Sequence, residues 1–325
     1  MPSTFTTLVP LLRLTRLAVG VGALVNAWFL VLWSRAVPEE RMMAPVGVVD
    51  VPLWRALFAA ALCGLGLYAF AAVLNDVVDR RRDAALHPSR PLPSGRVSLT
   101  RAGAMLVVLL TVALVGAAMM GPWSMWMTLG TAGAIVAFNT AGKFVPSAAL
   151  VMLSLIYGAQ MMTPNVYLSF VWPVCLTMTH ALAVGALSHR AGERRPLLSK
   201  RARVAAIAGW AFWTGVLLVV GHQRGGVWPD WVPWWVGVAP ALLAIGFLAF
   251  GRAALRRPGP GPARAALIQR VGALWLPAYG SAWLLGIGHL RAGAVLLGVA
   301  AAGVTALVLL RGVFDAAENP ARFLR

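Results

Sequence analysis

Three aspartates and one asparagine crowd the end of a long apolar segment, in the stretch NDVVDRRRD from Asn75 to Asp83. At about 100° per residue, the side chains of Asn75, Asp76, Asp79 and Asp83 share roughly a quarter of a helix surface. Three carboxylates on one face repel each other, and the C-terminal end of a helix disfavours anions. Oxygen ligands of these types suit Mg²⁺, which also binds substrate phosphates. The spacing therefore predicts a magnesium site at these four residues.

The continuation of this stretch, AALHPSRPLPSGRVS, favours a phosphate ligand beside the metal. The guanidinium groups of Arg90, Arg96 and Arg82 are suited to phosphoryl oxygens, and the prolines and glycine stiffen the loop that carries the first two. Lys143, in FNTAGKFVP, falls in the next loop on the same side and adds a point charge. A second interpretation stays open, in which the aspartates only pair with arginines at the membrane surface. The arginines in question are Arg80, Arg81, Arg82 and Arg101.

These groups must be positioned by membrane helices. Of the 325 residues, 60% are apolar and only 12% are charged, whereas a soluble domain carries about twice that charged fraction. A membrane span needs roughly 20 apolar residues. We expect an all-α, polytopic integral membrane bundle of nine or ten helices in a single domain, residues 1–325. The ten apolar segments are 13–33, 52–74, 102–120, 123–140, 147–163, 166–187, 203–220, 232–251, 268–288 and 292–310.

The net charge of +18 indicates membrane topology and not nucleic-acid binding. With a cytoplasmic N-terminus, most of the 28 Lys and Arg residues fall in inside loops, as the positive-inside rule predicts, and there they attract anionic membrane lipids. The candidate site then faces the cytoplasm. Arginine is strongly preferred over lysine, which is typical of a GC-rich bacterial gene and favours a bacterial inner membrane. The outside loops hold only Arg35, Arg41, Arg55, Arg224 and Arg291.

Small residues in the apolar segments, as in LGTAGAIVAF, predict close helix packing. We expect Gly103, Gly130 and Gly133 to serve that purpose. The two cysteines, Cys63 and Cys175, both lie in apolar segments, so a disulfide framework or a metal–thiolate site is not expected.

NDVVDRRRD followed by HPSRPLPSGRVS resembles the first aspartate-rich motif and trailing loop of the UbiA-type membrane prenyltransferase superfamily. The resemblance implies a helical bundle around a central lipophilic cavity that opens to the cytoplasm. It implies Asn75, Asp79 and Asp83 as ligands of a Mg²⁺–diphosphate, with Arg90 and Arg96 in the basic loop. The segment with Lys143 is similar to the family's fourth inter-helix segment. The implied activity is transfer of an isoprenyl group from a prenyl diphosphate donor to a lipophilic acceptor, with catalysis by Asp79, Asp83 and Lys143.

The sequence departs from the family pattern where a second aspartate-rich motif is expected. That place reads LSHRAGERRPLLSKR, and no aspartate occurs between Asp83 and Asp230. His189 and Glu193 have the spacing of neighbours on one helix face and would serve as replacement ligands, with histidine better suited to Mn²⁺ than to Mg²⁺. Two alternatives stay open, namely that these are ordinary loop residues, or that arginines neutralise the diphosphate without a second metal. Those basic residues are Arg194, Arg195 and Lys200.

Three other function classes stay open beside the enzyme. The first is a non-catalytic relative that binds an isoprenoid lipid and has lost its second metal motif. The second is a small-solute transporter, for which His180 is the only ionisable candidate deep in the first six spans. The third is a CDP-alcohol phosphotransferase, whose aspartates are paired with glycines that NDVVDRRRD lacks.

Overall fold

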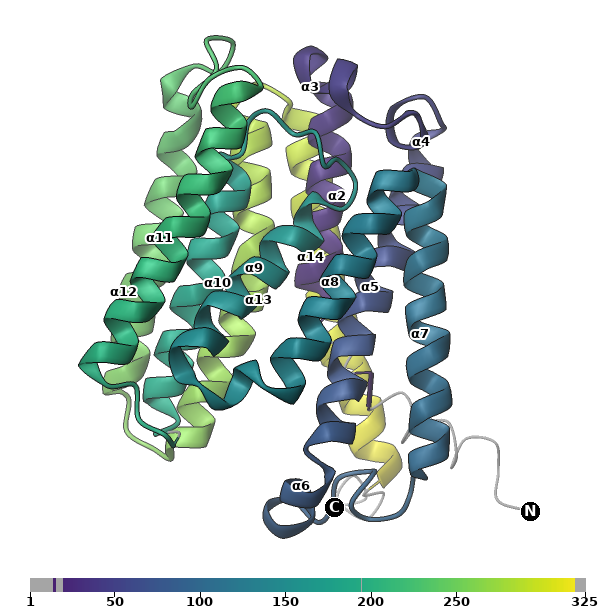
Figure 1. Ribbon diagram of the computed structural model, residues 1–325, viewed down its shortest axis with the longest axis vertical. Coiled ribbons are helices and arrows are strands. Elements are labelled where there is room, and N and C mark those ends of the chain that lie inside the picture. Colours follow the sequence, from purple (N-terminus) through teal and green to yellow (C-terminus); the bar gives the residue numbers. More distant parts are fainter. Residues whose placement is uncertain (1–13, 16–19, 194, 319–325) are drawn as a thin grey trace.

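The computed structural model describes residues 14–15, 20–193 and 195–318, and over these ranges it contains helices and no strands (Figure 1). The described ranges hold ten helices of 16 residues or more, one for each expected apolar segment. They are α2 (Val21–Ala36), α5 (Leu53–Val78), α7 (Leu99–Met120), α8 (Pro122–Thr140), α9 (Pro146–Met162), α10 (Trp172–Ala191), α11 (Lys200–Gln223), α12 (Val238–Arg256), α13 (Gly261–Gly286) and α14 (Leu290–Glu318). The all-helical prediction is confirmed. Helix α10 begins later than expected, at Trp172, where Pro173 takes an early helical position.

Several helices have the length and composition of membrane spans. Four meet both criteria, namely α5, α7, α11 and the run Trp234–Arg256 formed by the short 3₁₀ helix η3 (Trp234–Gly237) and α12. Shorter apolar helices include α2 and α9. Helix α11 exposes Ile207, Phe212 and Val219, which water would disfavour and lipid accepts. The molecule is a polytopic membrane bundle.

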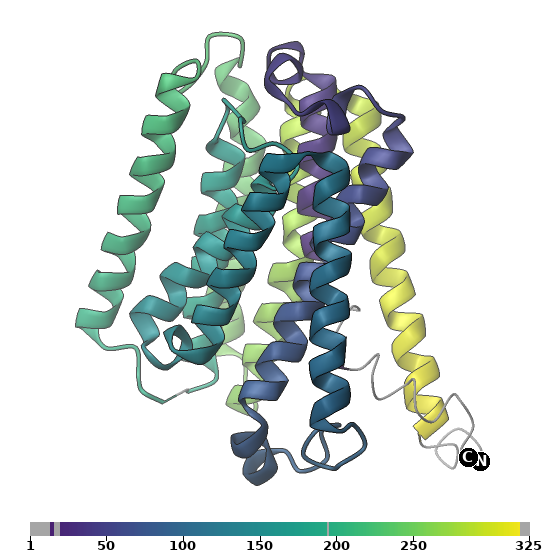
Figure 2. The same ribbon diagram turned by 45° about the vertical axis from the view of Figure 1, so that its right-hand side comes forward.

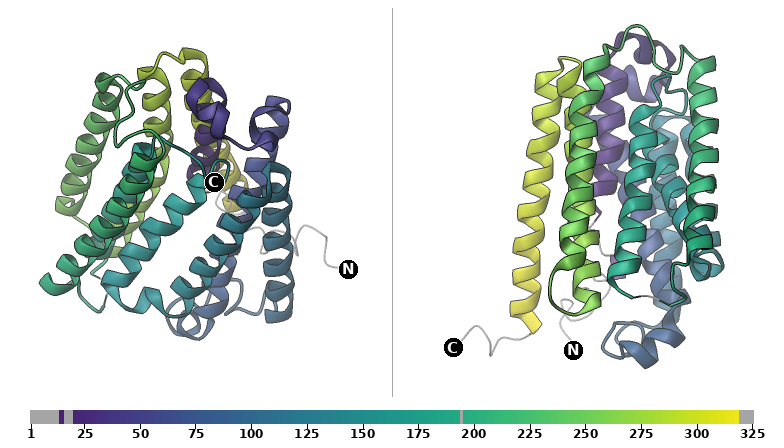
Figure 3. Two further views of the ribbon diagram at one scale, coloured as in Figure 1. Left: turned by 45° about the horizontal axis from the view of Figure 1, so that its top comes forward. Right: turned by 90° about the vertical axis from the view of Figure 1, so that its left-hand side faces the viewer.

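Consecutive long helices run up and down, so their connections collect at two ends (Figures 1 and 2). One end carries the short helices α3 (Pro38–Met43) and α4 (Val46–Val49), and the other carries α6 (Arg80–Leu86) and the loop after α10. Figure 3 shows the same antiparallel order from two further sides, with α14 alongside α13. The basic connections that the sequence places inside therefore share one end, which we call the basic end, with α6 among them.

Close packing of α5 against α7 holds the aspartate-bearing helix in place. A Cβ on Gly116 would lie 2.5 Å from the Ala59 carbonyl oxygen, and one on Gly66 would lie 2.9 Å from the Ala113 Cβ. Only glycine permits the helix backbones to approach so closely.

The prediction that Gly103, Gly130 and Gly133 mediate close packing is wrong, since a Cβ at any of the three would meet nothing within 4 Å. A count of small residues in a segment identifies neither the face that carries them nor the neighbouring helix. The packing glycines are found only when the helices are assembled.

At the end opposite the basic end, Glu40 of α3 is fully buried and ties the connection between α9 and α10 to α3. Its carboxylate accepts hydrogen bonds from the Ser169 hydroxyl at 2.8 Å, the Ser169 amide at 3.1 Å and the Phe170 amide at 2.8 Å. Burial raises the pKa of Glu40, while these donors act in the opposite direction. The carboxylate thus orders a loop that has no regular secondary structure.

We expect Gly116→Ala to lower the free energy of unfolding by about 1–3 kcal/mol, because the added methyl group would push α7 away from α5. The matched control is Gly103→Ala on the same helix, which should be neutral or stabilise by about 0.5–1 kcal/mol because its surroundings are open. Unfolding in detergent, followed by circular dichroism, measures both. Equal effects of the two substitutions would contradict the packing role of Gly116.

We also expect the loops of Ser94 and Ser199 to be labelled from the same side of the membrane, because both lie at the basic end. Single cysteines at these positions would react with an impermeant maleimide together, and one at Asp230, at the opposite end, would react from the other side. The natural cysteines Cys63 and Cys175 are buried, so the background should be low. Labelling of Ser94→Cys and Ser199→Cys from opposite sides would contradict this topology.

Candidate functional site

The aspartate-rich stretch lies where α5 ends and α6 begins. Asp79 forms the junction, with φ −81° and ψ 2°. Backbone hydrogen bonds from the Asp79 amide to the Asn75 carbonyl at 2.9 Å, and from the Asp83 amide to the Asp79 carbonyl at 2.8 Å, continue the helical spacing across the junction. Asp76 and Asp83 are buried, and Asn75 and Asp79 are half-buried. The junction therefore keeps the four side chains in helical register.

Lys143 contacts Asn75 and Asp79, the two half-buried residues of the motif, from a distant part of the chain. It belongs to η2 (Gly142–Phe144), the 3₁₀ turn between α8 and α9. Its Nζ donates hydrogen bonds to Asp79 Oδ1 at 2.7 Å and to Asn75 Oδ1 at 3.2 Å. One ammonium group thus lies between an amide oxygen and a carboxylate, a position in which a cation is stabilised by both.

Arg90 lies beside Asp76 and Asp83, the two buried carboxylates of the motif. Its Nη1 lies 2.5 Å from Asp83 Oδ2 and 4.0 Å from Asp76 Oδ1. The side chains of Asp76 and Asp83 are only 8% and 7% exposed, and a carboxylate buried to that degree needs a cation. Asn75 and Asp79 therefore share Lys143 as their cation, and Asp76 and Asp83 share Arg90.

The loop that carries Arg90 is itself well packed. Leu92 and Val97 are buried beside Val73 of α5, and Gly95 takes a positive φ of 73° in the turn between them. Arg96 donates to the Ser94 hydroxyl at 3.1 Å and to the carbonyl of Ser89. The position of Arg90 is thus set by a folded loop, in which Arg96 is a structural member.

The described ion pairs of the motif do not involve the arginines that the surface-pairing interpretation named, including Arg101. Arg80, Arg81 and Arg82 are exposed on α6, and the described ion pairs of the motif run to Arg90 and Lys143. Both cations were predicted from the sequence as phosphate ligands, and the structure places both at the carboxylates. Lys143 and Asp79 are 64 residues apart in the sequence, so no local sequence pattern shows that they pair.

The oxygen donors suit a hard divalent cation, but they do not enclose one alone. Within residues 20–193 and 195–318, no group of three His, Cys, Asp or Glu side chains is placed to hold a metal ion. Mg²⁺ commonly binds through one or two carboxylates and completes its shell with waters and phosphate oxygens. The residues present therefore fit Mg²⁺ that arrives with a phosphate ligand.

His189 and Glu193 do not share a helix face, so that part of the prediction is wrong. Helix α10 ends at Ala191, and Glu193 has φ 49°, the left-handed conformation with which helices often end. His189 Nε2 lies 3.0 Å from the Pro196 carbonyl oxygen, and Glu193 Oε1 accepts from Arg264 Nη2 at 3.3 Å.

The basic residues that follow are only partly described. Arg194 lies outside the described residues. Arg195 is exposed in the loop, and Lys200 is exposed at the start of α11. The structure therefore does not bring Arg195 or Lys200 into a buried site.

His180 forms a buried polar contact that sequence reasoning did not identify. Its Nδ1 lies 3.1 Å from the Tyr279 hydroxyl, and its Nε2 lies 2.9 Å from the Gly272 carbonyl oxygen. Both ring nitrogens are used to join α10 to α13, which is a structural role and not that of a residue on a transport pathway. No sequence signal connects residues so far apart.

Two solved structures with TM-scores above 0.5 share this fold, and a third is similar at a lower score. A structure of digeranylgeranylglyceryl phosphate synthase is 16% identical, covers 88% of this chain and 99% of its own, and superposes with a TM-score of 0.55. A UbiA homolog from Archaeoglobus fulgidus, bound to Cd²⁺, is 13% identical, with coverages of 84% and 99% and a TM-score of 0.52. A UbiA homolog from Archaeoglobus fulgidus bound to GPP and Mg²⁺ is 13% identical, with coverages of 91% and 99% and a TM-score of 0.48.

No curated protein matches the chain. The family model described as the UbiA prenyltransferase family matches residues 41–275, which include α5 through most of α13 and the whole aspartate-rich stretch. The chain belongs to the UbiA prenyltransferase family.

Proposed function

We propose that this protein transfers an isoprenyl group from a prenyl diphosphate to a lipophilic acceptor, with Mg²⁺ as cofactor. The observation that carries the proposal is the meeting of oxygen donors and cations where α5, α6 and η2 come together. Asn75 and Asp79 face Lys143, while Asp76 and Asp83 face Arg90.

A metal-bound diphosphate carries both signs of charge and therefore suits a site that holds both. The carboxylates and the Asn75 amide oxygen would contact the metal, and Lys143 and Arg90 would turn from the carboxylates to phosphoryl oxygens. Arg82, exposed on the adjacent α6, is available to the outer phosphate. Arginine and lysine both bind phosphate, arginine through two parallel hydrogen bonds and lysine as a point charge. Mn²⁺ has similar oxygen-ligand preferences and should also bind.

In the proposed reaction the bond between the allylic carbon and the diphosphate oxygen breaks, and its electron pair leaves with the diphosphate. The acceptor then bonds to that carbon and releases a proton. Lys143 and Arg90 stabilise the negative charge that develops on the leaving group, because they are already positioned at the site. The metal, when bound, adds Lewis-acid stabilisation of the same charge.

The membrane location is integral, and we propose the cytoplasmic face of a bacterial inner membrane for the site. The proposal rests on the positive-inside rule, since the basic connections lie at the end that carries α6. Both substrates would then enter from the membrane or the cytoplasm.

A second function, binding of an isoprenoid diphosphate lipid without turnover, is favoured by one observation. His189 and Glu193, the replacement ligands expected from the sequence, have different partners, the Pro196 carbonyl and Arg264, and form no second cluster in the described part of the chain. Turnover of a radiolabelled prenyl diphosphate in liposomes, with and without Mg²⁺, separates the two functions, since the non-catalytic protein would bind the donor and release no diphosphate.

We expect Asp79→Ala and Asp83→Ala each to weaken Mg²⁺-dependent binding of a prenyl diphosphate by about 100-fold, because each removes a charged partner from the site. In EDTA, Asp79→Ala should bind the diphosphate at least as well as the unmodified protein, because Lys143 loses its carboxylate partner. Titration calorimetry in detergent measures both. The matched control is Asp230→Ala, which removes an exposed carboxylate at the opposite end. Unchanged Mg²⁺-dependent binding in both aspartate variants would show that the carboxylates only pair with Lys143 and Arg90.

We expect the double variant His189→Ala/Glu193→Ala to keep turnover within about threefold and to leave the preference between Mg²⁺ and Mn²⁺ unchanged. The reason is that Glu193 is 77% exposed and bound to Arg264, so its removal takes no ligand from the first site. Turnover with Mg²⁺ and with Mn²⁺ is the measurement. A large loss of turnover in the double variant, or a changed preference between the two metals, would show instead that these residues bind a metal.

A further inference from the structure

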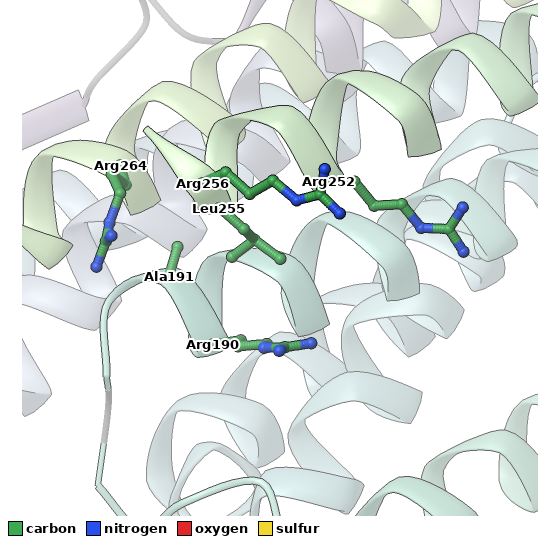
Figure 4. Close-up of a pocket in the computed structure, with 6 residues that line it drawn as sticks. All are labelled: Arg190, Ala191, Arg252, Leu255, Arg256 and Arg264. Carbon is green, nitrogen blue, oxygen red and sulfur yellow. The ribbon is translucent and has the colours of Figure 1, made fainter. Parts of the chain in front are cut away.

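Four arginines from three helix ends line a pocket away from the aspartate-rich stretch. Arg190 ends α10, Arg252 and Arg256 end α12, and Arg264 begins α13 (Figure 4). The pocket has a volume of about 340 Å³ and is open to the outside, with Leu255 and Ala191 between the arginines. It lies at the same end of the bundle as α6.

The charges of this pocket are mostly uncompensated. Among its described ion pairs, the single one joins Arg264 Nη2 to Glu193 Oε1 at 3.3 Å, and that carboxylate is largely exposed. The Nε of Arg264 is buried and has no hydrogen-bond partner. A buried guanidinium N–H without an acceptor is costly, so an acceptor at this position, such as water or an anion, would be stabilising. At the aspartate-rich stretch, in contrast, Arg90 contacts two carboxylates.

Helix dipoles explain only part of this cluster. Cations are favoured in the last turn of a helix, so Arg190 and Arg256 are well placed at the ends of α10 and α12. Arg252 precedes Arg256 by one helical turn and therefore lies on the same face. Arg264, however, lies in the first turn of α13, where the dipole disfavours a cation. Figure 4 shows Arg190 and Arg256 on either side of Leu255, with Arg264 beside Ala191.

We propose that this arginine pocket binds a phosphate group, distinct from the diphosphate of the prenyl donor. Arginine offers several N–H donors in a plane and is weakly hydrated, which suits phosphate esters. The apolar Leu255 and Ala191 leave room for an ester chain beside the charged group. The phosphate is presented either by an anionic phospholipid of the surrounding leaflet or by a soluble phosphate, and the pocket has the chemistry for both.

The test compares the double variant R252Q/R256Q with the control R201Q/R203Q, which removes the same charge from exposed positions at the start of α11, at the same end of the bundle. Each protein is delipidated in a neutral detergent and kept in EDTA. One arm titrates mixed micelles of phosphatidylglycerol, with phosphatidylcholine as the reference lipid, and follows bound lipid by native mass spectrometry. The other arm titrates inorganic phosphate and follows the unfolding temperature.

We expect saturable binding in one arm, weakened about tenfold or more in R252Q/R256Q through loss of charge-assisted hydrogen bonds and unchanged within about twofold in R201Q/R203Q. Binding of phosphatidylglycerol alone identifies a lipid phosphate, and binding of inorganic phosphate identifies a soluble one. No saturable binding in either arm, or equal losses in both double variants, overturns the proposal. If R252Q/R256Q does not fold, the single variant R190Q at an exposed position gives the same comparison.

This result is separable from the proposed transferase activity. Asp79→Ala should lose Mg²⁺-dependent prenyl diphosphate binding and keep phosphate binding at the arginine pocket, while R252Q/R256Q should do the reverse. If each variant lost both prenyl diphosphate binding and phosphate binding, the two ligands would share one site, and the proposal of a separate site would be overturned.

Discussion

Carboxylates crowded at the end of a membrane helix need cations, and this requirement organises the basic end of the molecule. Asp76 and Asp83 are buried and Asp79 is half-buried, and Asp76 lies in the last turn of α5, where the helix dipole is negative. Their repulsion is balanced by Lys143 and Arg90, which come from different loops. The contact between Lys143 and Asp79 joins the start of α9 to the end of α5. The pairing that satisfies the charges therefore also determines where two helix ends lie.

In the function that we propose, the same cations would change partners when the substrate binds. A cation that contacts a carboxylate in one state can contact a phosphate in another, provided that a metal replaces it at the carboxylate. Such an exchange keeps every charge compensated, which matters at an interface where water is limited. The folded loop around Leu92 and Val97 would keep Arg90 close during the proposed exchange, and α5 is held against α7 by close packing at Gly66 and Gly116.

The two halves of the basic end are built differently. The half with α5 and α6 holds acidic and basic groups in contact, whereas the half with α10, α12 and α13 holds arginines with a single exposed carboxylate. The resemblance to the family predicts a second aspartate-rich motif after α10, and in this chain that place carries basic residues instead. Charge on the second half is positive, so it attracts anions directly and offers few ligands to a metal.

Sequence by itself determined the helices and the shared face of the motif, because both depend on local periodicity. Ten apolar segments became ten helices, and Asn75, Asp79 and Asp83 kept helical register across the junction. Only the tertiary structure decided which cations meet the carboxylates, since Lys143 lies far from Asp79 in the chain. It also decided that Gly116 and not Gly103 packs helices, and that Glu193 turns away from His189 after α10 ends. These outcomes depend on which helices become neighbours and where each one stops, and residue spacing along a single segment does not contain that information.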